Sequence, residues 1–278
     1  MSPDPAGLSN GSARSMLLTM LGELVFPADE PVWTSSLLYV LTGIGIEERT
    51  ARQAIARGAA AGWITGERHG REVRFTLTPY GRALIEAGAE RVYSVGADDG
   101  PWDGRWLVLM VTIPQSARAV RRKLYGALRW AGFGNPAASV WLSPHLEREA
   151  EARRTVDELG LGDSTLSFVG PAASIGLDEA EIVRRAWDLD EVAARYESLL
   201  DRVKGLRPRG GDPLLFNHVL LVNEWQRFPF LDPQLPQELL PNWIGRRAAR
   251  VFRERREQRS AAALARWAEI VTLTAPAG

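Results

Sequence analysis

Polar side chains that could read DNA bases recur at every fourth position between residues 49 and 57. Arg49, Gln53 and Arg57 would lie along one stripe of a helix, because residues four apart share a helical face. A guanidinium group can form two hydrogen bonds with the edge of guanine, and a carboxamide can do the same with adenine. Exposed arginines are also common on helices that only face solvent, and the pattern alone does not decide between the two interpretations.

A short basic segment follows this stripe. Residues 63–65 predict the start of a strand, residues 66–71 a loop with two glycines, and the alternating residues 72–77 a returning strand. Positive side chains at the tip of such a hairpin can contact phosphates or enter a minor groove. The full set of expected DNA contacts is Arg49, Thr50, Arg52, Gln53, Arg57, Arg68, His69 and Arg71.

The stripe needs a helix that is buried on its other side. Small apolar residues recur at helical spacing from Ile46 to Gly62, which predicts such a face and a helix that ends near Gly62. A glycine-bearing turn at residues 43–46 would join this helix to another at residues 33–41. Two helices at a tight turn, followed by a hairpin, are the layout of a winged helix-turn-helix unit.

Two further helices complete an N-terminal domain over residues 1–95. Residues 12–26 carry apolar side chains at helical spacing behind Ser12, a potential N-cap. Pro79 can begin a helix that runs to about Val95 and links this domain to the rest. Acidic residues slightly outnumber arginines in the domain, so a positive electrostatic potential that attracts DNA would have to come from local clustering of arginines.

The rest of the chain predicts two more domains, which makes the fold class α+β. Residues 96–104 are rich in glycine, aspartate and proline and mark a domain boundary. Strands and helices then alternate, which favours a ferredoxin-like α+β domain over residues 96–180. Residues 181–278 predict an all-helical domain. The central strands are expected at 106–113, 139–142 and 165–169, the central helices at 116–132 and 147–159, and later helical segments at 178–204, 212–227, 236–240 and 243–270.

Arginines are concentrated in the last helix, at positions 246, 247, 250, 253, 255, 256 and 259. A solvated helix face is the simplest interpretation. The alternatives are a site for an anionic ligand, such as the phosphates of an acyl-coenzyme A, or a DNA backbone contact. The candidate effector contacts are Trp243, Arg246, Arg247 and Arg250.

Other classes of chemistry have little support in the sequence. The formal net charge is zero, and the absence of cysteine excludes disulfides, a cysteine nucleophile and thiolate metal sites. The three histidines are widely separated, no Gly-x-Ser-x-Gly motif is present, and the glycine-rich residues 132–137 follow a predicted helix instead of a strand. We expect no catalytic residues, metal or cofactor. Without a predicted signal peptide or membrane span, we expect a cytoplasmic protein.

Several blocks together resemble one family. The most specific reads Asp-Pro-x-Leu-Pro-x-Glu-Leu-Leu-Pro-x-Trp-x-Gly over residues 232–245. Others are Gly43-x-Gly45, Trp102-Asp-Gly-x-Trp106 and Trp187-Asp-Leu189. In this order, over roughly residues 12–259, the sequence resembles the PaaX family of transcriptional repressors, which control phenylacetate catabolism in bacteria.

The resemblance implies a repressor with a winged helix, a central ferredoxin-like domain similar to a CRISPR-associated nuclease fold, and a helical C-terminal domain. It implies a double-stranded operator as partner, a homodimer, and release by an acyl-coenzyme A thioester such as phenylacetyl-coenzyme A. The nuclease relatives carry an aspartate at the end of the first strand, where this chain has Val111-Thr-Ile-Pro114, so we expect no nuclease activity. The alternatives are a non-regulatory acyl-coenzyme A binder and a nucleic-acid-processing protein that uses the ferredoxin-like domain.

Overall fold

A computed structural model describes residues 12–96, 100–172, 175–206 and 208–276. The first eleven residues and residues 97–99 of the expected linker therefore lie outside the described part. The described residues form two compact units. One is drawn from Met1–Ser94, Ser198–Arg227 and Ala248–Gly278, and the other from Val95–Glu197 and Phe228–Arg247. Residues 181–278 contribute to both units, and the division into three domains stays a prediction.

The first unit begins with four helical elements that surround an apolar core. They are α1 (Ala13–Met20), the π-helix η1 (Leu21–Val25), α2 (Thr34–Gly43) and α3 (Glu48–Ala60). The predicted N-cap is confirmed, since the Ser12 hydroxyl accepts a hydrogen bond from the Ser15 amide at 3.2 Å. The predicted end of the third helix is also confirmed. Gly62 has a φ of 75°, and the Trp63 amide donates to the Gly58 carbonyl at 3.0 Å.

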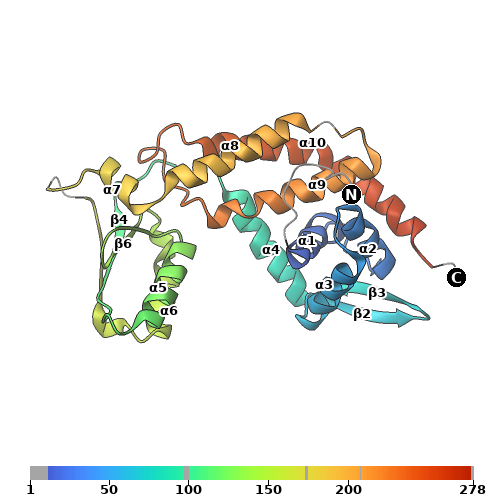
Figure 1. Ribbon diagram of the computed structural model, residues 1–278, viewed down its shortest axis with the longest axis horizontal. Coiled ribbons are helices and arrows are strands. Elements are labelled where there is room, and N and C mark those ends of the chain that lie inside the picture. Colours follow the sequence, from blue (N-terminus) through green and yellow to red (C-terminus); the bar gives the residue numbers. More distant parts are fainter. Residues whose placement is uncertain (1–11, 97–99, 173–174, 207, 277–278) are drawn as a thin grey trace. The chain divides into compact units, whose positions relative to one another are not determined.

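An antiparallel sheet follows α3, with the strand order β1-β3-β2. Its strands are β1 (Val32–Trp33), β2 (Ile64–His69) and β3 (Glu72–Leu77). The alternation expected in residues 72–77 is confirmed, because Phe75 and Leu77 are buried and Arg74 is exposed. Figure 1 shows β2 and β3 as a long hairpin beside α3.

Two sequence-based boundaries in this region are wrong. The loop expected at residues 66–71 is a strand as far as His69, and only Gly70 and Arg71 form the turn. Gly66 lies inside that strand, where a Cβ atom would come within 2.8 Å of Val73 and Phe75 side-chain atoms, so the glycine permits close packing. Trp33, expected in a helix, lies in β1 opposite Arg74.

Helix α4 and helices from the C-terminal part of the chain complete the first unit. They are α4 (Pro79–Ser94), α9 (Gly211–Trp225), and parts of α8 (Leu189–Gly205) and α10 (Ile244–Leu273). Most of α9 is buried, and its Asn223 side chain accepts a hydrogen bond from the Ser15 hydroxyl at 2.8 Å. At its other end Asp212 accepts hydrogen bonds from Tyr39 and Arg266, both at 2.7 Å. The N-terminal helices are therefore packed directly on the C-terminal ones.

The second unit contains an antiparallel sheet with the strand order β5-β6-β4-β7. The strands are β4 (Trp106–Val111), β5 (Gly134–Ala137), β6 (Val140–Ser143) and β7 (Thr165–Gly170). Helices α5 (Arg118–Trp130) and α6 (Glu149–Glu158) lie on one face of the sheet (Figure 1). Leu124 and Leu128 of α5 pack there against Leu109 and Trp141. The unit also contains α7 (Glu179–Ala186) and the short 3-10 helices η2 (Leu146–Arg148), η3 (Gly162–Ser164) and η4 (Phe228–Phe230).

Two features of the second unit differ from the sequence-based expectation. Strand β5 was not expected, because glycine, asparagine and proline are poor strand formers. The Asn135 side chain stabilises it by donating to the Ala137 and Val140 carbonyls at 2.8 and 2.7 Å. The helix expected at residues 236–240 is only a turn, in which two amides donate to the Pro236 carbonyl. Pro241 disfavours helical geometry in the residue before it and ends the segment.

Within the described ranges, no helix has the length and hydropathy needed to cross a membrane.

Candidate nucleic-acid interface

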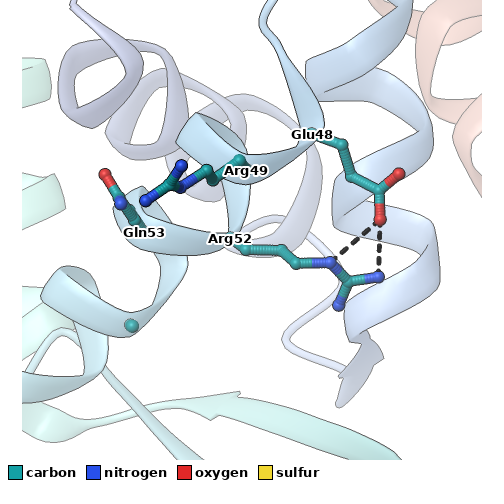
Figure 2. A pocket seen from close by; sticks show the side chains of 5 residues that line it. Glu48, Arg49, Arg52 and Gln53 are labelled. Carbon is teal, nitrogen blue, oxygen red and sulfur yellow. Dashed lines mark hydrogen bonds and ion pairs between the residues drawn. The ribbon is translucent and has the colours of Figure 1, made fainter.

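Helix α3 separates its polar side chains from its apolar ones. Ala51, Ala54 and Ile55 are buried against the core, where α1 and α2 pack on α3. The expected DNA contacts on this helix, Arg49, Thr50, Arg52, Gln53 and Arg57, are all exposed. An open hollow on this surface is lined by Glu48, Arg49, Arg52, Gln53 and Ala56 (Figure 2). The structure thus brings three of the five together, while Arg57 lies one turn further along.

The three expected contacts in this hollow differ in their hydrogen bonding. Figure 2 shows Arg49 and Gln53 side by side, while Arg52 is turned toward Glu48. The Arg52 Nε and Nη2 atoms donate to Glu48 Oε1 at 2.9 and 2.7 Å. Among the described residues, the side chains of Arg49 and Gln53 have no hydrogen-bond partner. These two groups are therefore available to a ligand without loss of an existing contact.

The Glu48–Arg52 pair is weak enough to exchange. Both side chains are more than half exposed, at 61% and 58%. Exposed ion pairs four residues apart on a helix contribute only about 0.3–0.5 kcal/mol. Arg52 can therefore leave Glu48 for a base or a phosphate at little cost. In the unbound protein, the pair also neutralises an acidic group at the start of the helix.

The hairpin presents its three expected contacts differently. The Arg68 Nε atom donates a hydrogen bond to the Gly70 carbonyl at 3.1 Å and so stabilises the turn. The His69 ring lies edge-on to Trp33, with the centroids 5.5 Å apart. Arg71 is exposed at the tip and has no hydrogen-bond partner in the described part of the chain. Arg71 is thus the group at the tip that can most readily reach a phosphate.

Another arginine of the hairpin was missed in the sequence. Arg74 is exposed on β3, and its guanidinium lies 5.5 Å from the centre of the Trp33 ring. The signal was present, because Arg74 occupies a solvent-facing position of the alternating strand. Its position opposite Glu67 in the hairpin became clear only with the register of β2 and β3.

A second cluster of polar side chains lies in the interior of the first unit. Glu23, in η1, accepts hydrogen bonds from Arg256 Nε and Nη2 at 3.0 and 3.1 Å and from the Tyr93 hydroxyl at 2.7 Å. His218 Nε2 lies 2.9 Å from the same carboxylate. We call these four residues, from η1, α4, α9 and α10, the Glu23 cluster. Sequence reasoning missed it, since nothing local connects residues so far apart in the chain.

Glu23 remains ionised in this cluster. Burial disfavours its charged form, but the hydrogen bonds from His218 and Arg256 outweigh that effect and lower the pKa of Glu23 from 4.5 to about 2. Burial and the neighbouring carboxylate raise the pKa of Tyr93, so that its hydroxyl stays a donor. The cluster also coincides with a π-helical turn, a distortion often found at functional sites.

Comparison with known proteins identifies the family of this chain. Three family models match successive segments: PaaX-like protein over residues 12–81, PaaX protein central Cas2-like domain over residues 99–182, and PaaX-like protein C-terminal domain over residues 187–269. The transcriptional repressor PaaX of Escherichia coli (strain K12) is 30% identical over an alignment 250 residues long, which covers 85% of this chain and 77% of the repressor. The chain belongs to the PaaX family of transcriptional regulators. The family resemblance seen in the sequence is confirmed.

A solved structure also resembles this PaaX-family chain. The uncharacterized protein Rv0674 from Mycobacterium tuberculosis superposes with a TM-score of 0.62 over 93% of this chain and 98% of its own. Its sequence is 22% identical. At that identity, the likeness shows a shared α+β fold alone.

The sequence block at residues 232–245 has a structural explanation in this PaaX-family chain. Asp232 is buried, and its Oδ2 atom accepts hydrogen bonds from the Tyr196 hydroxyl at 2.7 Å and from Trp243 Nε1 at 2.8 Å. Arg246 donates to the Leu240 and Leu235 carbonyls at 2.8 and 2.9 Å. The bonds from Trp243 and Arg246 fold the proline-rich segment onto itself, and the bond from Tyr196 attaches the segment to α8.

The expected effector contacts therefore differ in their surroundings. Trp243 and Arg246 are committed to the fold of the 232–246 segment, whereas Arg247 and Arg250 are exposed on α10. Their role with an effector stays a prediction. Among the residues that the structure describes, no group of three or more histidine, aspartate or glutamate side chains could hold a metal ion.

Proposed function

We propose that this PaaX-family protein is a sequence-specific repressor that binds double-stranded operator DNA through a winged helix-turn-helix. The observation that carries the proposal is the exposed pair Arg49 and Gln53 on a helix whose opposite face is buried. An α-helix fits the major groove, where arginine can recognise guanine and glutamine adenine. The repressor named among its relatives supports the same role.

The hairpin β2–β3 is the wing in this proposal. Arg71 at its tip and Arg68 beside it contact the phosphate backbone, while Arg49, Arg52 and Gln53 contact bases. Thr50, Arg57 and His69 complete the interface at its margins. In this arrangement the helix supplies sequence preference and the wing supplies affinity that does not depend on sequence.

In this proposal, the rest of the molecule serves dimerisation and regulation. The strand order β5-β6-β4-β7 with two helices on one face supports a ferredoxin-like central domain. We propose a cytoplasmic homodimer that binds a two-fold symmetric operator. A small effector, an acyl-coenzyme A thioester such as phenylacetyl-coenzyme A, releases it from the DNA.

The direct test is to recover the DNA fragments that the purified protein retains from its own genome. We expect a small set of fragments with a shared inverted repeat, and their release when phenylacetyl-coenzyme A is added. Retention of random fragments at physiological salt would contradict sequence-specific binding. If the thioester does not change the retention, operator binding would stand and this effector would be rejected.

A further inference from the structure

An open hollow lies beside the Glu23 cluster, at the surface of the first unit. Its volume is about 630 Å³. The side chains around it come from α4 and from one face of α10, where positions three and four apart recur. They are Tyr93, Arg253, Arg256, Glu257, Ser260, Ala261 and Leu264. Among them, only Arg253 and Arg256 belong to the basic segment noted in the sequence.

The lining of this hollow is amphipathic. Two guanidinium groups and the Ser260 hydroxyl can donate hydrogen bonds to an anionic group. Ala261 and Leu264 offer an apolar surface on the next turn of the same helix. Glu257 lowers the net positive charge of the lining. This combination suits an organic anion that also carries an apolar group.

Arg256 belongs both to this hollow and to the buried Glu23 cluster. Its Nε and Nη2 atoms bind the Glu23 carboxylate, and its guanidinium lies 4.6 Å from the centre of the Tyr93 ring. The Arg256 side chain is 33% exposed, whereas that of Glu23 is 7% exposed. An anion in the hollow would therefore compete with Glu23 for the same guanidinium.

Such competition would affect helix α3. A buried carboxylate that loses an ionic partner is strongly destabilised. Glu23 lies in η1, which continues directly from α1, and α1 packs against α3. The structure therefore contains a continuous packed route from the hollow, through Arg256 and Glu23, to the helix that carries Arg49 and Gln53.

We propose that the hollow between α4 and α10 is the effector site, that it takes a small organic anion with an apolar group, and that Arg256 and Glu23 couple its occupancy to DNA binding. The coupling, but not the site itself, rests on the proposed repressor function. Because coupling between two sites is reciprocal, operator DNA should weaken ligand binding by the same factor as the ligand weakens DNA binding.

Calorimetry on the full chain without DNA tests the site. The probes are phenylacetyl-coenzyme A, coenzyme A and phenylacetate, and the variants are Arg253→Ala, Ala261→Phe and the control Arg250→Ala. We expect at least one probe to bind, with affinity reduced roughly 10-fold or more by Arg253→Ala and by the bulky Ala261→Phe. The proposed site does not include Arg250, in contrast to the effector contacts expected from the sequence. Arg250→Ala, which replaces an exposed arginine of the same helix outside the hollow, should therefore bind the probes normally.

The probes also distinguish the source of the anionic group. Binding of phenylacetate alone would assign a carboxylate, and binding of only the coenzyme A compounds would assign phosphates. No binding by any of the three probes would overturn the site. Equal affinities in all variants, or a loss confined to Arg250→Ala, would overturn it as well.

Operator binding, measured separately, tests the coupling. We expect Arg253→Ala and Ala261→Phe to bind DNA normally in the absence of ligand. We expect Glu23→Gln to bind the probe and the DNA while the factor by which one weakens the other falls toward one. An unchanged factor in Glu23→Gln would overturn the coupling. Failure of the wild-type protein to bind any operator would instead reject the proposed function, and the calorimetry would still decide the site.

Discussion

One buried residue, Glu23, stabilises the fold and, in the proposed mechanism, also couples ligand binding to DNA binding. Its carboxylate has partners on three other helices, and the residues that bind it are 70, 195 and 233 positions away in the chain. No local pattern predicts such contacts, and in the sequence Glu23 is only a polar interruption of an apolar helix. By contrast, the exposure of Arg49 and Gln53 could be predicted, because it follows from helical periodicity over a few residues.

The ionisation of Glu23 should be visible in acid. Its pKa is about 2 in the folded protein against 4.5 when unperturbed. A lowered pKa stabilises the fold above pH 4.5, and this contribution, on the order of 3 kcal/mol, is lost as the pH falls from 4.5 toward 2. Urea unfolding of Glu23→Gln should therefore show a lower free energy of unfolding at pH 7 and a smaller fall in that window.

The matched control for this measurement is Glu86→Gln, an exposed glutamate on α4. It should follow the wild-type curve. If Glu23→Gln kept the full acid dependence of the wild type, the assignment of Glu23 as an ionised, hydrogen-bonded group would be wrong.

At the scale of elements, the junction between the hairpin and α4 depends on Gly81. A Cβ atom there would come within 2.0 Å of the Trp63 carbonyl oxygen, which is backbone and cannot rotate away. Gly81→Ala should destabilise the protein by about 1–3 kcal/mol or more, through overpacking. Thermal and urea unfolding measure the change.

Gly88 provides the control within the same helix. It is exposed, and a Cβ atom there meets nothing within 4 Å. Gly88→Ala should stabilise the protein by about 0.5–1 kcal/mol, because alanine favours the helix. Similar losses in both variants would mean that the close approach at Gly81 is not what limits substitution.

The hairpin should contribute affinity without sequence preference. Replacing Arg71 by alanine removes one phosphate contact in the proposed complex, so it should weaken binding to the operator and to unrelated duplexes by similar factors. The slope of log K against log salt should fall in magnitude by about 0.9. A loss confined to the operator would show instead that Arg71 contacts bases.

Elements differed in how far the sequence could predict them. Long amphipathic helices such as α4, α5 and α10 were placed within a few residues, because their periodicity reflects burial. Strand β5 and residues 66–69 of β2 were missed, because Gly66 and Asn135 act through close packing and side-chain hydrogen bonds that propensity does not include.

At the scale of the whole molecule, the N-terminal helices depend on the end of the chain. Trp225 packs parallel to Phe252 and donates to the Val92 carbonyl at 3.0 Å, while Ser15 is bonded to α9. A fragment of residues 1–95 should therefore expose apolar surface that α9 and α10 cover in the full chain. We expect lower thermal stability and stronger binding of a hydrophobic dye than in the full protein. A fragment as stable as the full chain would show that the C-terminal helices do not stabilise the N-terminal ones.

The most direct test of the central proposal compares operator and scrambled duplexes by fluorescence anisotropy at fixed salt. The variants are Arg49→Ala, Gln53→Ala and the control Arg154→Ala, an exposed arginine on α6. We expect each of the first two to lose about 1–3 kcal/mol on the operator and little on the scrambled duplex, because paired hydrogen bonds to bases would be removed. The control should bind like the wild type. Equal losses on both duplexes, or none, would contradict the assignment of α3 as the helix that reads the operator.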